Sequence, residues 1–127
     1  MPRPSPDLRL KRVYDPPEES DGARVLVDRL WPRGLRKDAA RLTLWLKEIA
    51  PSPALRKWFG HDPARFAEFS RRYRADLGND EAAIGRIDAL LAEGPVTVLY
   101  AAHDPEHNHA RVLADYLRRR REKGVSR

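Results

Sequence analysis

The amino-acid sequence predicts a small α/β domain, with helices packed on a mostly parallel sheet of about three strands. Three short apolar segments, residues 8–15, 23–30 and 96–102, have the composition of strands. Segments with apolar residues at helical spacing fill most of the chain between the second and third strands, and one more follows the third. Strands joined by long crossovers pair in parallel, and right-handed crossovers place helices on both faces of the sheet, so we expect three layers.

The three predicted strands differ in how deeply they should be buried. Residues 8–15 (LRLKRVYD) alternate apolar and basic side chains, which is typical of a half-exposed strand. Residues 23–30 (ARVLVDRL) predict a more deeply buried strand, and residues 96–102 (VTVLYAA) predict one that is covered on both faces. The loop 16–22 would also allow the first two strands to pair antiparallel, and the sequence leaves that alternative open.

Five segments show helical patterns: residues 39–50, 53–59, 63–78, 80–94 and 109–124. Ser52 and Asp62 each precede a proline and suit the N-cap position of the helix that follows. Gly78 and Gly94 suit helix ends. The connection between the second and third strands is therefore expected to be almost entirely helical.

Length and composition restrict the class of protein. A chain of 127 residues is expected to form one domain over residues 1–127, and 41% hydrophobic with 35% charged residues is a globular composition. The absence of cysteine excludes disulfides, thiolate metal sites and a cysteine nucleophile. No apolar run approaches the roughly 18 residues of a membrane span, and no signal peptide is recognisable, so we expect a cytoplasmic protein. Residues 1–7, with three prolines, are expected to be flexible.

The net charge of +6 favours anionic partners such as phosphorylated metabolites or nucleic acid, without choosing between them. The basic tail 118–127 begins with RRRREK, which complements the negative end of a helix dipole. No aromatic residue is interleaved in that run, so it is a weak signal for nucleic-acid binding. No glycine-rich phosphate loop and no serine at a strand-to-helix elbow is present.

Two polar loops follow predicted strands, DRLWPRG after the second and HDPEHNHA after the third. Ligands bind outside the carboxyl ends of strands in open parallel sheets, so we expect these loops to meet at one edge. Arg29 and Arg33 would hold phosphate or carboxylate by paired hydrogen bonds, and Trp31 between them would stack on or cover a ligand. The alternative is structural, with Trp31 packed on a helix and Arg29 paired with a carboxylate such as Asp104.

The second loop offers groups for acid–base chemistry. Asp104 and His109 are the candidate catalytic residues, and Asn108 would orient a ligand. His103 and His107 are four residues apart, but Pro105 between them argues against helical geometry. No metal ligands are therefore assigned, and the sequence leaves open whether a metal binds near His103, Asp104, His107 and His109. In the structural alternative, Asp104 instead caps the last helix.

The fragments RVYD, DGARVLVDRLWPRG, APSPALRKWF, HDPARFAEF and VTVLYAAHDPEHNHA resemble, in that order, the YeaO-like proteins of the domain-of-unknown-function 488 family. The resemblance covers about residues 8–117 and implies a compact α/β protein with no established activity. Some members are labelled MarR-type transcription regulators, but the order of elements here does not suit a winged helix-turn-helix. The motif positions fall on seven residues: Arg29, Trp31, Arg33, Gly34, Asp104, Asn108 and His109.

The resemblance also marks two departures. Family members often carry lysine where this chain has His103, which argues against an essential role for that histidine. Other branches carry a cysteine–histidine pair where this chain has Asn108 and His109, so thiol chemistry is not transferred.

Three hypotheses remain for function. The first is a site for a small anion, such as a nucleotide, at the strand ends, with hydrolysis or group transfer as the reaction; Gly34 belongs to this ligand-binding set. The second is a nucleic-acid-binding module, and the third is an interaction protein in which the two loops lock onto each other. The sequence identifies no cofactor and leaves the oligomeric state open.

Overall fold

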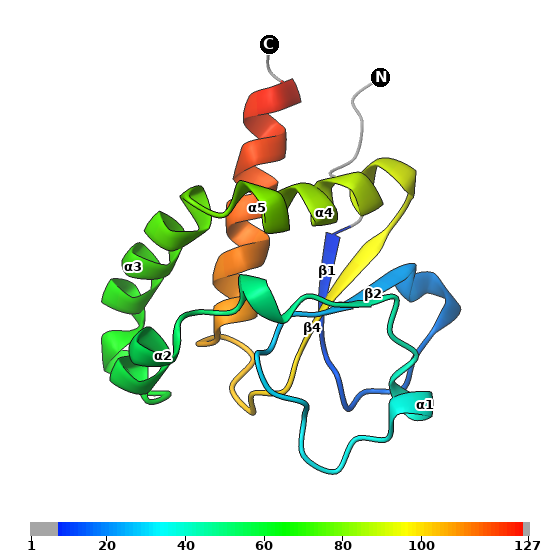
Figure 1. Ribbon diagram of the computed structural model, residues 1–127, viewed down its shortest axis with the longest axis horizontal. Coiled ribbons are helices and arrows are strands. Elements are labelled where there is room, and N and C mark those ends of the chain that lie inside the picture. The colour runs from blue at the N-terminus through cyan, green and yellow to red at the C-terminus, as the bar shows by residue number, and fades with distance from the viewer. Residues whose placement is uncertain (1–7, 126–127) are drawn as a thin grey trace.

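Four parallel strands form a central sheet in the computed structural model, which describes residues 8–125 (Figure 1). In sheet order they are β1 (Leu8–Arg12), β4 (Val96–Tyr100), β2 (Ala23–Leu26) and β3 (Leu44–Trp45). The predicted α/β class with a parallel sheet is confirmed. The antiparallel alternative for the first two strands is wrong, because β4 lies between β1 and β2 and pairs with both in parallel. The N-terminal segment expected to be flexible lies outside the described residues, as does the end of the basic tail.

One face of the sheet carries the main hydrophobic core. The register aligns Leu10, Val98 and Val25 across three strands, and side chains at aligned positions share a face. Four helices cover this face: α2 (Pro53–Phe59), α3 (Phe66–Gly78), α4 (Glu81–Glu93) and α5 (His109–Val125). Within residues 8–125, no helix has the length and apolar character needed to cross a bilayer.

The other face is covered by the segment 28–45, which contains the four-residue helix α1 (Lys37–Ala40). Leu26 and Leu99 point to this face and form a second small core with Val13, against which Trp31 and Trp45 pack. Figure 1 shows α1 well apart from the four longer helices. The third layer is therefore mostly loop.

The predicted helix over 39–50 is wrong. Arg41 has φ of 49°, in the left-handed region, and ends α1 there. Thr43 and Leu46 then donate backbone hydrogen bonds to β2, which makes the intervening residues strand β3, followed by a 3-10 turn at Lys47–Ile49. The apolar residues at the end of this segment belong to the strand region, where Trp45 packs in the second core and Leu46 packs in the main core.

The predicted N-caps at Ser52 and Asp62 are confirmed. The Ser52 hydroxyl accepts from the Leu55 backbone N–H at 3.1 Å, and the Asp62 carboxylate accepts from the Ala64 N–H at 3.0 Å. Asp62 caps the 3-10 turn Pro63–Arg65, which runs directly into α3. These caps set the start of α2 and the start of the turn that leads into α3.

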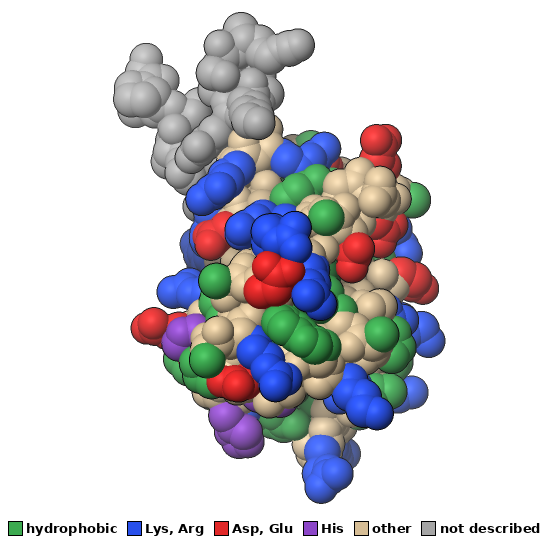
Figure 2. Space-filling view, turned by 90° about the vertical axis from the view of Figure 1, so that its left-hand side faces the viewer, with side chains coloured by type: hydrophobic (Ala, Val, Ile, Leu, Met, Phe, Trp, Pro, Cys, Tyr) green, Lys and Arg blue, Asp and Glu red, His purple; other side chains and the backbone are tan. Residues whose placement is uncertain are grey.

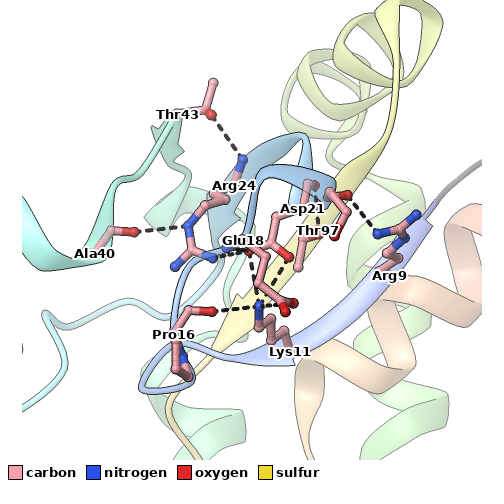
Figure 3. A network of polar contacts seen from close by, with 10 residues as sticks. Arg9, Lys11, Pro16, Glu18, Asp21, Arg24, Ala40, Thr43 and Thr97 are labelled. Atoms are coloured by element: carbon pink, nitrogen blue, oxygen red, sulfur yellow. Dashed lines mark hydrogen bonds and ion pairs between the residues drawn. The ribbon is translucent and has the colours of Figure 1, made fainter.

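A buried charge network anchors the loop between β1 and β2 (Figure 3). Asp21 lies in a 3-10 turn (Glu19–Asp21) and accepts hydrogen bonds from Arg24 Nη1 at 2.5 Å and from Lys11 Nζ at 3.1 Å. The next residue, Gly22, has φ of 66°, and a Cβ atom there would lie 2.3 Å from the carbonyl oxygen of Pro95. Only glycine allows the loop to pass this close to the start of β4.

Candidate functional site

A pocket of about 480 Å³ lies at the carboxyl ends of β2 and β4. Residues of both loops, 28–33 and 101–109, line it, together with Ala50 and Pro51 before α2, Arg56 and Phe59 in the second half of α2, and the N-terminus of α5. The two loops therefore meet at one edge of the sheet, as expected for adjacent parallel strands.

The pocket carries an excess of positive charge. Three arginines line it, Arg29, Arg33 and Arg56, with the histidines 61, 103 and 109, against the two carboxylates of Asp28 and Asp104. Within the described side chains, none of the three arginines pairs with a carboxylate. Arg56 was not predicted from the sequence, because only the packing of α2 against the strand ends brings it to this edge.

Asp28, which the sequence reasoning missed, joins the two loops. It comes directly after the buried Val27, two residues past the end of β2, and its Oδ2 accepts from the Ala101 backbone N–H at 3.1 Å. Its Oδ1 lies 3.2 Å from Nε2 of His109. An aspartate at the very end of a buried strand was the available signal, since such positions face the ligand-binding edge of parallel sheets.

One ring nitrogen of His109 faces two oxygen atoms, and its hydrogen bond goes to the Val27 carbonyl, while Asp28 Oδ1 has no hydrogen-bond partner. Nε2 lies 3.0 Å from the carbonyl oxygen of Val27 and 3.2 Å from Asp28 Oδ1. Because both neighbours can only accept, Nε2 carries a proton, and Nδ1 is the nitrogen left for other contacts. Tyr73 packs edge-on at 6.2 Å between ring centroids, and burial raises its pKa, so it remains a neutral phenol that donates to Ile49.

The arginines of the first loop do not form the expected ion pair with Asp104. Arg29 Nη2 instead donates to the carbonyl oxygens of Ala50 at 3.1 Å and Pro51 at 3.3 Å, and its buried Nε has no partner. Arg29 thus ties the loop to the segment before α2. The Arg33 side chain is exposed, and only its backbone carbonyl is engaged, by the hydroxyl of Tyr14 at 2.8 Å.

Asp104 and Asn108 organise the second loop. Asp104 Oδ1 accepts from the Glu106 and His107 N–H groups, at 2.9 and 3.1 Å. These bonds, the Glu106 N–H foremost, and the His107 ring hold the pKa of the Asp104 carboxyl below its usual value. Asn108, 2% exposed, accepts from the Arg111 N–H at 2.9 Å and donates to the Asp104 carbonyl at 2.8 Å. The cap of the last helix is therefore Asn108 rather than Asp104, and its amide is used within the loop.

Trp31 and Gly34 lie outside the residues that line the pocket. The Trp31 indole N–H donates to the Leu35 carbonyl at 2.8 Å, and its ring meets Trp45 edge-to-face at 5.3 Å on the opposite face of the sheet. The ring packs against the second core, where it covers apolar side chains. Trp31 is therefore not positioned to stack on a ligand in this pocket. Gly34, with φ of 76°, allows the turn that follows Arg33.

The histidines of the second loop separate in space. His107 Nδ1 lies 2.9 Å from Asp104 Oδ2 and its ring meets Phe66 edge-on, whereas His103 is exposed at the pocket. Across the part of the chain that the structure describes, no cluster of three or more His, Asp or Glu side chains could hold a metal ion.

Comparison with known proteins settles the family. Residues 7–125 match the family model described as the inactive DUF488-N3 subclade. The chain belongs to the DUF488 family. An uncharacterised protein of Escherichia coli K12, YeaO, is 47% identical over 112 residues, covering 88% of this chain and 97% of that protein. An uncharacterised protein of Mycobacterium tuberculosis H37Rv is 44% identical over 110 residues, covering 87% and 92%. No solved structure matches the chain.

The YeaO-like resemblance inferred from the sequence motifs is thus confirmed, and the DUF488 motif residues divide into two groups. Arg29, Arg33 and His109 line the pocket with groups that can meet a ligand. Asp104 and Asn108 also line the pocket, but their polar groups are engaged within the second loop, and Trp31 and Gly34 lie outside the pocket. Chemically, the DUF488 pocket offers guanidinium groups and the imidazoles of three histidines, an arrangement suited to holding an anion.

Proposed function

We propose that this DUF488 protein binds a small anion, carrying phosphate or carboxylate, in the pocket at the carboxyl ends of β2 and β4. The observation that carries the proposal is the set of three pocket arginines without carboxylate partners, Arg29, Arg33 and Arg56. A guanidinium group binds phosphate or carboxylate by paired, charge-assisted hydrogen bonds. The two pocket carboxylates are already engaged with backbone N–H groups and histidine rings, so they repel an anion less than free carboxylates would.

Two further features support an anion in this pocket. Asn108 and His109, at the start of the 17-residue helix α5, line it, and the positive end of a helix dipole favours negative charge. His109 presents Nδ1, which donates a hydrogen bond to an anion when the ring is protonated and accepts one when it is neutral.

Binding without turnover is the form of the proposal that we favour over hydrolysis or group transfer. The matching family model is described as inactive. Asp104, one of the two expected catalytic residues, has its carboxylate oxygens occupied by Glu106 and His107. The histidines 61, 103 and 109 are left for acid–base work, with no serine or cysteine among the pocket residues to act as a nucleophile.

The nucleic-acid alternative has no specific observation in its favour. Arg118 donates to the Leu8 carbonyl and pairs with Asp115, and Arg120 pairs with Asp88, so part of the basic run is committed within the domain. On the face drawn in Figure 2, lysine and arginine side chains are interspersed with acidic ones. A continuous basic stripe, which backbone binding of nucleic acid requires, is not seen on that face.

Isothermal titration with inorganic phosphate, pyrophosphate, acetate and citrate tests the proposal. Arg33→Ala and Arg56→Ala should each weaken binding by about tenfold to 100-fold, the equivalent of a charge-assisted hydrogen-bond pair. Arg86→Ala is the matched control, because Arg86 is an exposed arginine on α4 outside the pocket. The proposal is overturned if none of the four anions binds, or if the two pocket variants bind as well as Arg86→Ala.

A further inference from the structure

The exposed apolar side chains of this protein converge on the same pocket. Within the described residues, two large hydrophobic side chains are left exposed, Tyr14 at 41% and Leu30 at 62%. Both line the pocket, although they come from different strand ends. Apolar groups gathered at one concave place mark a binding surface rather than an accident of an ordinary surface.

Tyr14 is held rigidly beside Arg33. Its hydroxyl donates to the Arg33 carbonyl at 2.8 Å, and the Arg12 guanidinium lies 5.0 Å from the ring centroid. Arg12 is itself fixed by donating to the carbonyls of Ala101 and Ala102, at 3.0 and 2.9 Å. The aromatic ring is therefore placed in advance next to a cationic residue of the anion site, which lowers the entropy lost when a ligand binds.

The inner wall of the pocket is also aromatic. Phe59 and Phe69 line it while being 4% and 1% exposed, with their rings stacked at 4.3 Å between centroids. By contrast, Arg33 and Arg56 are exposed, so they lie at the solvent side of the same space. The inner wall thus has an apolar part beside the half-buried Asp28, Arg29 and His109, and the exposed arginines lie toward solvent.

The volume exceeds what an inorganic anion needs. The pocket of about 480 Å³ falls within the roughly 300–1,000 Å³ that is typical of sites for small organic ligands. A bare phosphate or acetate would fill a minor part of that space and leave the apolar wall uncovered. A ligand with a body as well as a charge would use both parts of the pocket.

We propose that the ligand is an amphipathic anion, with one phosphate or carboxylate group on a flat aromatic body. This inference rests on the proposed function and adds the chemical class of the ligand. The anionic group takes Arg33 and Arg56, while the ring lies against Tyr14 and Leu30 and reaches toward Phe59. Aromatic rings favour aromatic walls, since they stack or meet edge-to-face beyond the gain from burial alone.

The experiment compares phenyl phosphate with inorganic phosphate and hexyl phosphate, by isothermal titration at one ionic strength. Phenyl phosphate should bind at least about tenfold tighter than inorganic phosphate, because burying the ring adds apolar contact area. Leu30→Ala should weaken phenyl phosphate by roughly threefold to tenfold and leave inorganic phosphate unchanged. Leu30→Met is the matched control, since it keeps an apolar side chain of similar volume and should retain the affinity. Leu30 is exposed, so neither variant should impair folding.

The outcomes separate this inference from the proposed function. Equal affinity for phenyl and inorganic phosphate, with Leu30→Ala changing neither, overturns the amphipathic ligand and leaves the anion site standing. Hexyl phosphate binding as tightly as phenyl phosphate overturns the aromatic assignment. Binding of none of the three compounds overturns the proposed function together with this inference.

Discussion

Asp21 is the residue whose loss should destabilise the fold most directly. Its side chain is 4% exposed and accepts hydrogen bonds from Arg24 Nη1 at 2.5 Å, Lys11 Nζ at 3.1 Å and the Glu18 N–H at 3.0 Å. The Arg24 side chain is 5% exposed, and its Nη2 already lacks a partner. In Asp21→Ala the buried guanidinium would keep only the hydrogen bond from Nε to the Ala40 carbonyl.

The size of the effect follows from the burial of the pair. Removing one partner of a buried ion pair typically costs about 3–5 kcal/mol, because the other charge stays buried and uncompensated. Lys11 contributes little to the loss, since its side chain is 16% exposed and keeps Glu18 as a partner. We therefore expect Asp21→Ala to lower the free energy of unfolding by about 3–4 kcal/mol, which corresponds to a fall in Tm of roughly 10–15 °C for a domain of this size.

Urea denaturation followed by tryptophan fluorescence and circular dichroism measures this difference. Asp38→Ala is the control, because the Arg36–Asp38 pair has side chains 81% and 74% exposed and should contribute less than about 1 kcal/mol. The double variant Asp21→Ala with Arg24→Met should recover part of the loss, since no charge is left buried. Two results would refute the reasoning. One is a free energy of unfolding of Asp21→Ala within about 1 kcal/mol of the wild-type value. The other is a double variant that is less stable than either single variant.

Two further predictions concern acid stability and the second core. Burial raises the pKa of Asp21, but hydrogen bonds from Glu18, Lys11 and Arg24 outweigh it and hold that pKa below the ordinary value of 3.8. A depressed folded-state pKa stabilises the fold above the unfolded-state pKa and loses this contribution as the pH falls through the folded one. The urea concentration at the unfolding midpoint of the wild type should therefore decrease as the pH is lowered below about 4. The midpoint of Asp21→Asn should decrease less over the same pH range. Trp31→Phe should lower stability by about 1–3 kcal/mol through lost packing and the lost bond to Leu35, yet leave anion affinity unchanged in titrations. A weaker anion affinity in Trp31→Phe at unchanged stability would contradict the position of Trp31 on the opposite face.

Local signals in the sequence predicted much of the fold. Proline and capping residues marked the starts of α2 and α3, and the apolar run at 96–100 marked the central strand. The prediction of a helix over residues 39–50 was wrong because the apolar spacing there suits a helix as well as a strand. Two backbone hydrogen bonds to β2, which no local pattern reveals, decided for a strand.

The candidate site was predictable in place but not in detail. Parallel strands next to each other place their following loops at one edge, so Arg29, Arg33 and His109 could be expected to meet. The contacts of Asp28 and the position of Arg56 at the pocket could not be predicted, because both depend on how distant segments pack. The contacts of Trp31 could not be predicted for the same reason, since the second core against which it packs exists only once β2 and β4 are paired.

The amino-acid sequence by itself determined the α/β class, most of the helices and the two loops that carry the charged groups. These depend on residue spacing, capping and turn chemistry, which act over a few positions along the chain. The tertiary structure alone decided which side chains make contacts that stabilise the fold and which remain accessible at the pocket. That division depends on burial and on contacts between segments such as 28–33 and 101–109, which are far apart in the chain.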